Sequence, residues 1–155
     1  MTAYLLGELL NEAGLPHGVV NIIFGTGASA GAALAQHSDV PLLSFTGGTA
    51  TGRKILEASI PRFKKTSLEL GGKNAALVFA DADIAEAAIT CVRSAFQNQG
   101  EICLCNSRIF VEASAYDVFV EKFVRTASLL RVGDPEEKTT QLGPLVSREH
   151  REKVM

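Results

Sequence analysis

Short apolar or β-branched runs alternate with helix-like segments along the 155-residue chain, and this alternation limits the fold more than any other feature. A strand, a helix and a second strand form the unit from which parallel sheets are built. We therefore predict an α/β fold with a mostly parallel sheet. The expected strands are 19–24, 41–45, 66–70, 75–79 and 107–112, and the expected helices are 2–13, 28–37, 49–59, 81–97, 115–130 and a last one from Ser147.

The glycine pair Gly71-Gly72 is the best candidate for a domain boundary. The strands and helices before it resemble a mononucleotide-binding unit, whereas the longer elements after it carry the cysteines. This pattern predicts two domains, 1–70 and 71–155. The chain also begins inside one helical pattern and ends inside another, so we expect it to be part of a longer enzyme.

Composition and charge argue against several classes of partner. The net charge is −2, and no basic face is dense enough to suggest nucleic acid. No apolar run approaches the length of a membrane span, and the N-terminus lacks the features of a secretory signal or transit peptide. The basic pair Lys64-Lys65 is expected to be the solvated end of a strand. Three cysteines without disulfide-type spacing indicate free thiols, a reducing compartment and a cytoplasmic location.

Two glycine-rich turns each follow a predicted strand and precede a predicted helix. FGTGASAG contains Gly25, Gly27 and Gly31, with a spacing one residue longer than the usual dinucleotide fingerprint. Its glycines could equally serve to let a helix pack closely on the sheet. SFTGGTATG places the free N–H groups of Gly47, Gly48 and Thr49 at a helix start, which attracts a phosphate. Together the two turns favour a nucleotide.

A single carboxylate interrupts the apolar strand LELGGKN at Glu69. Burying a carboxylate is costly unless it is paired or takes part in a reaction. If Glu69 is partly buried, its protonated form is favoured, and it could serve as a general base near neutral pH. The alternative is a glutamate at the strand edge that faces water.

The three cysteines call for different interpretations. Cys91 lies in a predicted helix beside alanines, which is typical of core packing. Cys103 and Cys105 form a C-x-C pair without a nearby histidine or a second pair, so a metal site is not expected. Their spacing would strain a mutual disulfide. A packed thiol or a nucleophile remains for Cys103, which would need a base from elsewhere, and Glu69 is the obvious candidate.

These motifs resemble the signatures of the NAD(P)-dependent aldehyde dehydrogenases. LELGGK is followed at 96–103 by FQNQGEIC, FTGGTATG resembles the cofactor turn of the family, and EAGLPHGVVNIIFGTG resembles the segment before it. The resemblance covers essentially the whole chain. The segments SLELGGKNAALVF and GEICLCNSRIFVE are most similar in sequence to the branch that oxidises muconic semialdehydes, such as 2-aminomuconic semialdehyde. The resemblance implies part of a Rossmann-like cofactor domain over 1–70, followed by the start of an α/β catalytic domain over 71–155.

The resemblance also implies roles for individual residues. Cys103 matches the nucleophile of the family, Glu69 its general base, and Cys105 a variable position beside the site. Gly48 stands where a serine is common. The implied contacts with the cofactor, NAD or alternatively NADP, are made by Gly25, Gly27, Gly47, Gly48, Thr49, Gly52 and Leu70.

The implied reaction is the oxidation of an aldehyde to its acid through a thiohemiacetal and a thioester at Cys103. Glu69 favours hydrolysis of the thioester over transfer to coenzyme A, because acylating relatives tend to lack this glutamate. The oxyanion-hole asparagine of the family and a ribose-binding lysine are expected upstream of Met1, and a second glutamate and the dimerisation strand downstream of Met155. We therefore expect the full-length protein to be a homodimer or homotetramer. The hypothesis that follows is that the isolated chain is unstable or inactive. The alternative function is that of a truncated, non-catalytic dinucleotide- or partner-binding remnant.

Overall fold

The computed structural model describes all residues from Met1 to Met155 and divides into two compact units, Met1–Leu70 and Gly71–Met155. The first unit contains α1 (Thr2–Glu12), a π-helical turn (Gly27–Gly31), α2 (Ala32–Gln36), β1 (Leu42–Gly47), α3 (Thr49–Ser59), a short 3₁₀ turn (Ile60–Arg62) and β2 (Lys65–Leu70). The second contains β3 (Asn74–Val78), α4 (Ile84–Phe96), a short turn (Gln97–Gly100), β4 (Asn106–Val111), a 3₁₀ turn (Ala113–Ala115), α5 (Tyr116–Ala127) and α6 (Arg148–Val154). None of the helices is long and apolar enough to cross a membrane.

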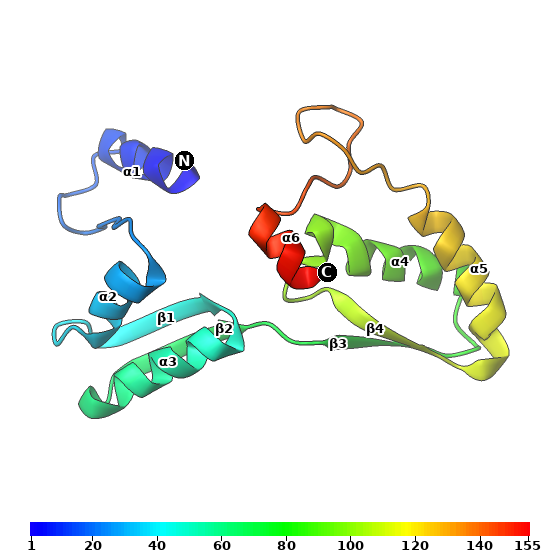
Figure 1. Cartoon of the computed structure of the whole chain (residues 1–155), viewed down its shortest axis with the longest axis horizontal. Helices are drawn as coiled ribbons and strands as arrows, with labels where there is room; N and C mark the ends of the chain where they lie inside the picture. Colours follow the sequence, from blue (N-terminus) through cyan, green and yellow to red (C-terminus); the bar gives the residue numbers. More distant parts are fainter. The chain divides into compact units, whose positions relative to one another are not determined.

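Both strand pairs are parallel, as the alternation of strands and helices predicted. In the first unit β1 pairs with β2, from Leu42 opposite Lys65 to Gly47 opposite Leu70, and α3 is the crossover that lies along the pair (Figure 1). In the second unit β3 pairs with β4, and α4 is the crossover. The mixed α/β class with parallel strands is therefore confirmed.

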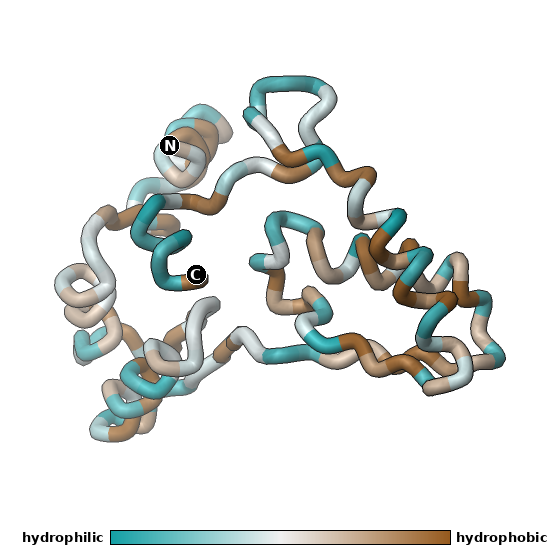
Figure 2. The backbone as a smooth tube through the Cα atoms, turned by 45° about the vertical axis from the view of Figure 1, so that its right-hand side comes forward, coloured by the Kyte–Doolittle hydropathy of each residue, from teal (hydrophilic) through white to brown (hydrophobic).

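The second unit has a continuous apolar core between its strands and two helices. Val78 of β3, Ala88 and Cys91 of α4 and Phe119 of α5 are buried against one another. The ring of Phe119 stacks on Phe123 with the centroids 5.7 Å apart. Asp83 caps α4 by accepting hydrogen bonds from two backbone N–H groups of its first turn. The connection between α5 and α6 has a hydrophilic tip and runs outside this core (Figure 2).

The expected strand at 19–24 is wrong. These residues belong to neither strand pair, and Val19, Val20, Ile23 and Phe24 are exposed. A β-branched run favours an extended backbone, but it becomes a strand only where a neighbouring strand satisfies its N–H and C=O groups. The sheet of the first unit consists of β1 and β2 alone, and neither pairs with 19–24.

Lys64 also differs from the expectation of a solvated strand end. Its side chain is buried, and its ammonium group donates to the carbonyl oxygens of Ala35 at 2.7 Å and His37 at 2.6 Å. These carbonyls lie at the C-terminal end of α2, where the helix dipole favours a positive charge. The preceding residue, Phe63, takes a left-handed conformation with φ of 50°. Lys64 thus ties α2 to the start of β2.

We expect Lys64→Met to destabilise the first unit by about 1–3 kcal/mol, because two carbonyl groups lose their charged donor. Lys65→Met is the matched control, because Lys65 is the exposed neighbour and should change stability by less than about 0.5 kcal/mol. Urea unfolding followed by far-ultraviolet circular dichroism measures both. Equal midpoints for the two variants would contradict the role given to Lys64.

Candidate active site

One end of the β1–β2 pair gathers most of the residues assigned to the cofactor. Because the strands are parallel, their carboxyl ends meet at one edge, where Gly47 lies opposite Leu70. Gly48 follows directly and is the N-cap of α3, so Thr49 is the first residue of that helix. Ligands of open parallel sheets bind at this edge of the strands.

Gly52 has a clear reason to be glycine within the chain. A Cβ built on it would lie 2.8 Å from Cδ2 of Leu70, which is closer than real Cβ contacts. The absence of a side chain at Gly52 therefore lets α3 pack tightly on β2. This packing explains the presence of Gly52 and Leu70 without contact to a ligand.

Gly48 is different, because nothing in the structure obstructs a side chain there. A Cβ built on Gly48 meets no atom within 4 Å, and its φ of −74° suits any residue. No side chain caps α3 and no acidic residue lies in its first turn. The N–H groups of Thr51 and Gly52 bond to the carbonyl of Gly48, which leaves those of Thr49 and Ala50 free for an anion.

The first glycine turn forms the entry to α2. Gly25 packs closely on Ala30, whose Cβ would lie 2.7 Å from an added Cβ, whereas the space beside Gly27 is open. Gly27 opens the π-helical turn, whose N-cap is Thr26. The hydroxyl groups of Thr26 and Ser29 are hydrogen-bonded at 2.9 Å.

Glu69 lies on the exposed face of β2. The strand alternates, so Leu68 and Leu70 are half-buried while Glu69 between them is exposed. Since Leu70 packs on α3, the carboxylate of Glu69 points to the opposite face of the strand pair. Glu69 belongs to the first unit and Cys103 to the second.

The three cysteines are free and lie in three different environments: Cys91 is buried, Cys105 is half-buried and Cys103 is exposed. Burial in the core raises the pKa of the Cys91 thiol, which keeps it protonated at neutral pH. The Cys105 thiol donates to the carbonyl of Gln97 at 3.5 Å. Of the three, only Cys103 is an exposed residue, as a nucleophile must be.

The turn that carries Cys103 begins with a strained segment that the sequence analysis missed. Asn98, Gln99 and Gly100 all have positive φ, at 50°, 57° and 77°. Asparagine and glycine tolerate this left-handed region, whereas Gln99 is held there at a cost of about 1–2 kcal/mol. Such strain is typical of functional turns. The segment closes with a hydrogen bond from the Glu101 N–H to the Asn98 carbonyl at 2.9 Å.

The backbone around Cys103 leaves several donors unused. The Cys105 N–H bonds to the carbonyl of Ile102 at 2.9 Å, while the N–H groups of Ile102, Cys103 and Leu104 donate to no backbone or side-chain acceptor. A free N–H next to the sulfur of a candidate nucleophile suits an oxyanion. Asn74, which no sequence motif indicated, contacts the same turn through its side chain.

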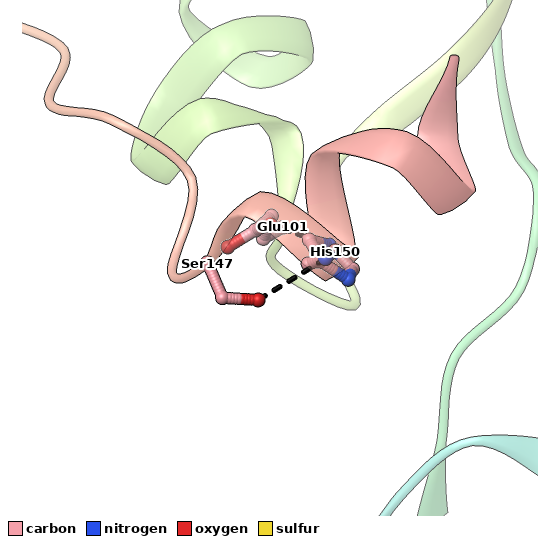
Figure 3. A network of polar contacts seen from close by, with 3 residues as sticks. All are labelled: Glu101, Ser147 and His150. Carbon is pink, nitrogen blue, oxygen red and sulfur yellow. Dashed lines mark hydrogen bonds and ion pairs between the residues drawn. The ribbon is translucent and has the colours of Figure 1, made fainter.

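Helix α6 contacts the turn through one polar pair (Figure 3). The Nε2 atom of His150 lies 2.9 Å from Oε1 of Glu101, and Ser147 caps α6 by accepting from the His150 N–H at 3.1 Å. Both partners are about one-third exposed, so the pair adds little to stability. No group of three or more histidine, cysteine, aspartate or glutamate side chains is placed to hold a metal ion.

Comparison with known proteins identifies the family of the chain. The model of the aldehyde dehydrogenase family matches residues 1–155. The chain is 56% identical over 154 residues to 2-aminomuconic semialdehyde dehydrogenase of Danio rerio, covering 99% of this chain and 32% of that protein. It is 51% identical over 154 residues to 5-carboxymethyl-2-hydroxymuconate semialdehyde dehydrogenase of Escherichia coli, with the same two shares covered. A crystal structure of betaine aldehyde dehydrogenase from Staphylococcus aureus with NAD+ superposes with a TM-score of 0.95 at 34% identity, covering 99% of this chain and 30% of that one.

The chain therefore belongs to the aldehyde dehydrogenase family, as its motifs indicated. It spans about a third of the length of the relatives it matches.

We expect Gly100→Ala to destabilise the second unit by about 1–2 kcal/mol, because alanine is strained at a φ of 77° and its Cβ would lie 3.0 Å from the Ala95 carbonyl oxygen. Gly71→Ala is the control, since its Cβ would meet nothing within 4 Å. Urea unfolding gives both free energies. A loss at Gly100 no larger than that at Gly71 would contradict the strain assigned to this turn.

We expect iodoacetamide at neutral pH to alkylate Cys103 at least about tenfold faster than Cys91, because only an accessible thiolate reacts. Peptide mass spectrometry gives the rate at each cysteine. Unfolding the chain in urea should bring the two rates together, which shows that the fold causes the difference. Comparable rates in the folded chain would refute the burial of Cys91 or the exposure of Cys103.

Proposed function

We propose that the protein oxidises an aldehyde to a carboxylic acid with NAD, with Cys103 as the nucleophile and Glu69 as the general base. The observation that carries this proposal is the exposed thiol of Cys103 on a strained turn, with its own backbone N–H free. Membership of the aldehyde dehydrogenase family supports the reaction class.

The chemistry follows from these groups. The Cys103 thiolate adds to the aldehyde carbon, and the carbonyl electrons move to oxygen, where the Cys103 N–H stabilises the oxyanion. Bound NAD supplies the acceptor for the hydride that leaves this carbon. Loss of the hydride converts the thiohemiacetal at Cys103 to a thioester. Glu69 takes a proton from water, the hydroxide formed attacks the thioester, and the acid leaves as the thiolate is restored.

Glu69 has to act by accepting a proton. A permanently charged carboxylate beside the sulfur would disfavour the thiolate, so it cannot serve as a simple electrostatic activator. Its exposed position on β2 leaves the carboxylate free to meet water or substrate. A glutamate here favours water over coenzyme A as the acceptor of the acyl group.

The residues of the first unit fit a dinucleotide. The free N–H groups of Thr49 and Ala50, at a helix start without any acidic side chain, would hold the pyrophosphate. Gly48 lacks a side chain although nothing in the chain requires this, which is what close approach of a ligand demands. Gly47 and Leu70 lie beside it at the edge of the sheet, and Gly25 and Gly27 would lie toward the adenosine end. Gly52 would act by holding α3 against Leu70.

The domain organisation, assembly and substrate complete the proposal. Residues 1–70 would be the C-terminal half of a Rossmann-like dinucleotide domain, and 71–155 the N-terminal half of the catalytic domain. The full-length protein would be a cytoplasmic homodimer or homotetramer. Muconic-type semialdehydes are the proposed substrates, because relatives at 46–56% identity are named for them.

The competing function is that of a remnant that binds a dinucleotide or a partner without catalysis. The chain spans about a third of the relatives' length, so the match to them does not by itself assign their activity to it. A hybrid enzyme separates the two. The 154 aligned residues of this chain would replace the matching third of the Danio rerio relative, and NADH formation from a muconic-type semialdehyde would be measured, with the purified 155-residue chain assayed in parallel.

We expect an active hybrid in which Cys103→Ser abolishes NADH formation. Glu69→Gln should slow steady turnover by roughly 10²–10⁴-fold, the usual contribution of a general base, while a first burst of NADH survives. Calorimetric binding of NAD+ should persist in Cys103→Ser, which shows that the variant hybrid is folded. A hybrid that binds NAD+ but forms no NADH would favour the remnant, and full turnover by Cys103→Ser would refute the nucleophile.

A further inference from the structure

The amide side chain of Asn74 bridges the turn that carries Cys103. Its Nδ2 atom makes a short hydrogen bond to the carbonyl oxygen of Cys103 and a longer one, at 3.4 Å, to that of Cys105. Both partners are acceptors, so the NH₂ end of the amide must face them, and its two hydrogens match the two carbonyls. One side chain from β3 thus holds both ends of a three-residue segment of the turn.

The sheet places Asn74 where this contact is possible. Asn74 is the first residue of β3 and pairs with Asn106, the first residue of β4, which comes directly after Cys105. The register shifts between Asn74 and Ala75, because Ala75 pairs with Arg108 and Ser107 is the extra residue on β4. Such bulges re-aim side chains and are frequent beside active sites. The bulge lies beside the residue whose amide reaches the turn.

We propose that Asn74 is a positioning residue for the nucleophile: its amide fixes the Cys103 turn in the one conformation that leaves the Cys103 sulfur and N–H exposed. The peptide bond is planar, so holding the Cys103 carbonyl sets the orientation of the whole 103–104 peptide group. This keeps the carbonyl dipole directed at β3, away from an oxyanion developing at the substrate. The inference rests on the proposed role of Cys103 but concerns a residue to which that proposal gives no part.

The accessibility of the Cys105 thiol can be used to measure the effect of Asn74 on the turn. Its thiol is half-buried and bonded to Gln97, and its carbonyl is one of the two that Asn74 holds. When the bridge is lost, the turn loosens and the Cys105 thiol becomes accessible. Cys91 in the core of α4 reports any general loosening of the same unit. The three cysteines therefore separate a local effect on the turn from loss of the fold.

The experiment measures iodoacetamide alkylation of each cysteine in the 155-residue chain, its Asn74→Ala variant and its Asn74→Asp variant. Aspartate keeps the shape of asparagine but at neutral pH has no hydrogen to donate. We expect both variants to raise the alkylation rate of Cys105 relative to Cys103 by roughly tenfold, the effect of losing about one net hydrogen bond, with the Cys91 rate unchanged.

Arg108→Met is the matched control. Arg108 donates from Nη2 to the carbonyl of Lys73 at 2.8 Å, so it also ties β4 to the segment that leads into β3, but its side chain makes no hydrogen bond to the turn. This variant should leave the ratio of Cys105 to Cys103 alkylation unchanged. An equal rise of this ratio in Arg108→Met would contradict a specific role for Asn74 in positioning the turn. A parallel rise of the Cys91 alkylation rate in the Asn74 variants would contradict it too, because both results indicate a general loosening of the strands. No rise at Cys105 in either Asn74 variant would overturn the bridge.

A measurement on the unaltered chain keeps the inference testable if the variants do not fold. In ¹⁵N-labelled protein the side-chain NH₂ of Asn74 should exchange its hydrogens roughly tenfold more slowly than that of Asn11, whose exposed amide makes no side-chain hydrogen bond. Equal exchange at the two amides would refute the bridge. Neither measurement requires aldehyde oxidation, so its failure is distinct from failure of the proposed function.

Discussion

The parallel pairing of β3 with β4 determines where the Cys103 turn lies. In a parallel pair both strands start at the same edge, so the segment leading into β4 meets the segment leading into β3. The first segment carries Cys103 and the second carries Gly71–Lys73 and Asn74. The contacts from Asn74 and Arg108 to this edge follow from the topology. The crossover helix α4 makes the pairing possible, because its buried face covers the strands and supplies the core.

The first unit is also built on a parallel strand pair, but its candidate site lies at the opposite end of the strands. There the residues proposed to bind the cofactor lie at the carboxyl ends of β1 and β2, where Gly47, Gly48 and Leu70 come together. The chain leaves this edge at Leu70 and enters β3 at Asn74, so only Gly71–Lys73 separate the two edges along the sequence. The motif LELGGKN thus links the carboxyl edge of one parallel pair to the amino edge of the other. Two glycines and no large apolar side chain suit such a connection.

Local patterns predicted most of the fold. Helical periodicity located α1, α3, α4 and α5 to within a few residues, and Asp83 caps α4 as a polar residue before an apolar helix should. The failure at 19–24 has a physical cause, because strand propensity describes one chain and strand formation requires a partner. The prediction of a solvated Lys64 was wrong for a related reason. Adjacent lysines suggest a solvated surface, and nothing nearby in sequence indicates that the carbonyls at the end of α2 lie within hydrogen-bond distance.

The candidate site likewise has a part that the sequence predicts and a part that it does not. Cys103 and the glycine turns stand out because their chemistry is written in short motifs, whereas their surroundings depend on contacts between distant residues. The amide of Asn74 meets a carbonyl of Cys103, 29 positions further along the chain, and no pattern in LELGGKN indicates this. The left-handed conformation of Gln99 is equally invisible, since glutamine has no preference for it. Motifs therefore indicated the candidate nucleophile, and only the structure showed which side chain contacts its turn.

The burial of Lys64 has a consequence for how the chain can be observed. An amine whose hydrogens are engaged by two carbonyl groups is shielded from acylating reagents for as long as α2 and β2 stay together. Cys91 is shielded in the same manner by the helices and strands of the other unit. Each unit thus encloses one reactive group of a distinct chemical type. Pulse labelling with an amine reagent and a thiol reagent would measure the opening rate of each unit separately within a single molecule.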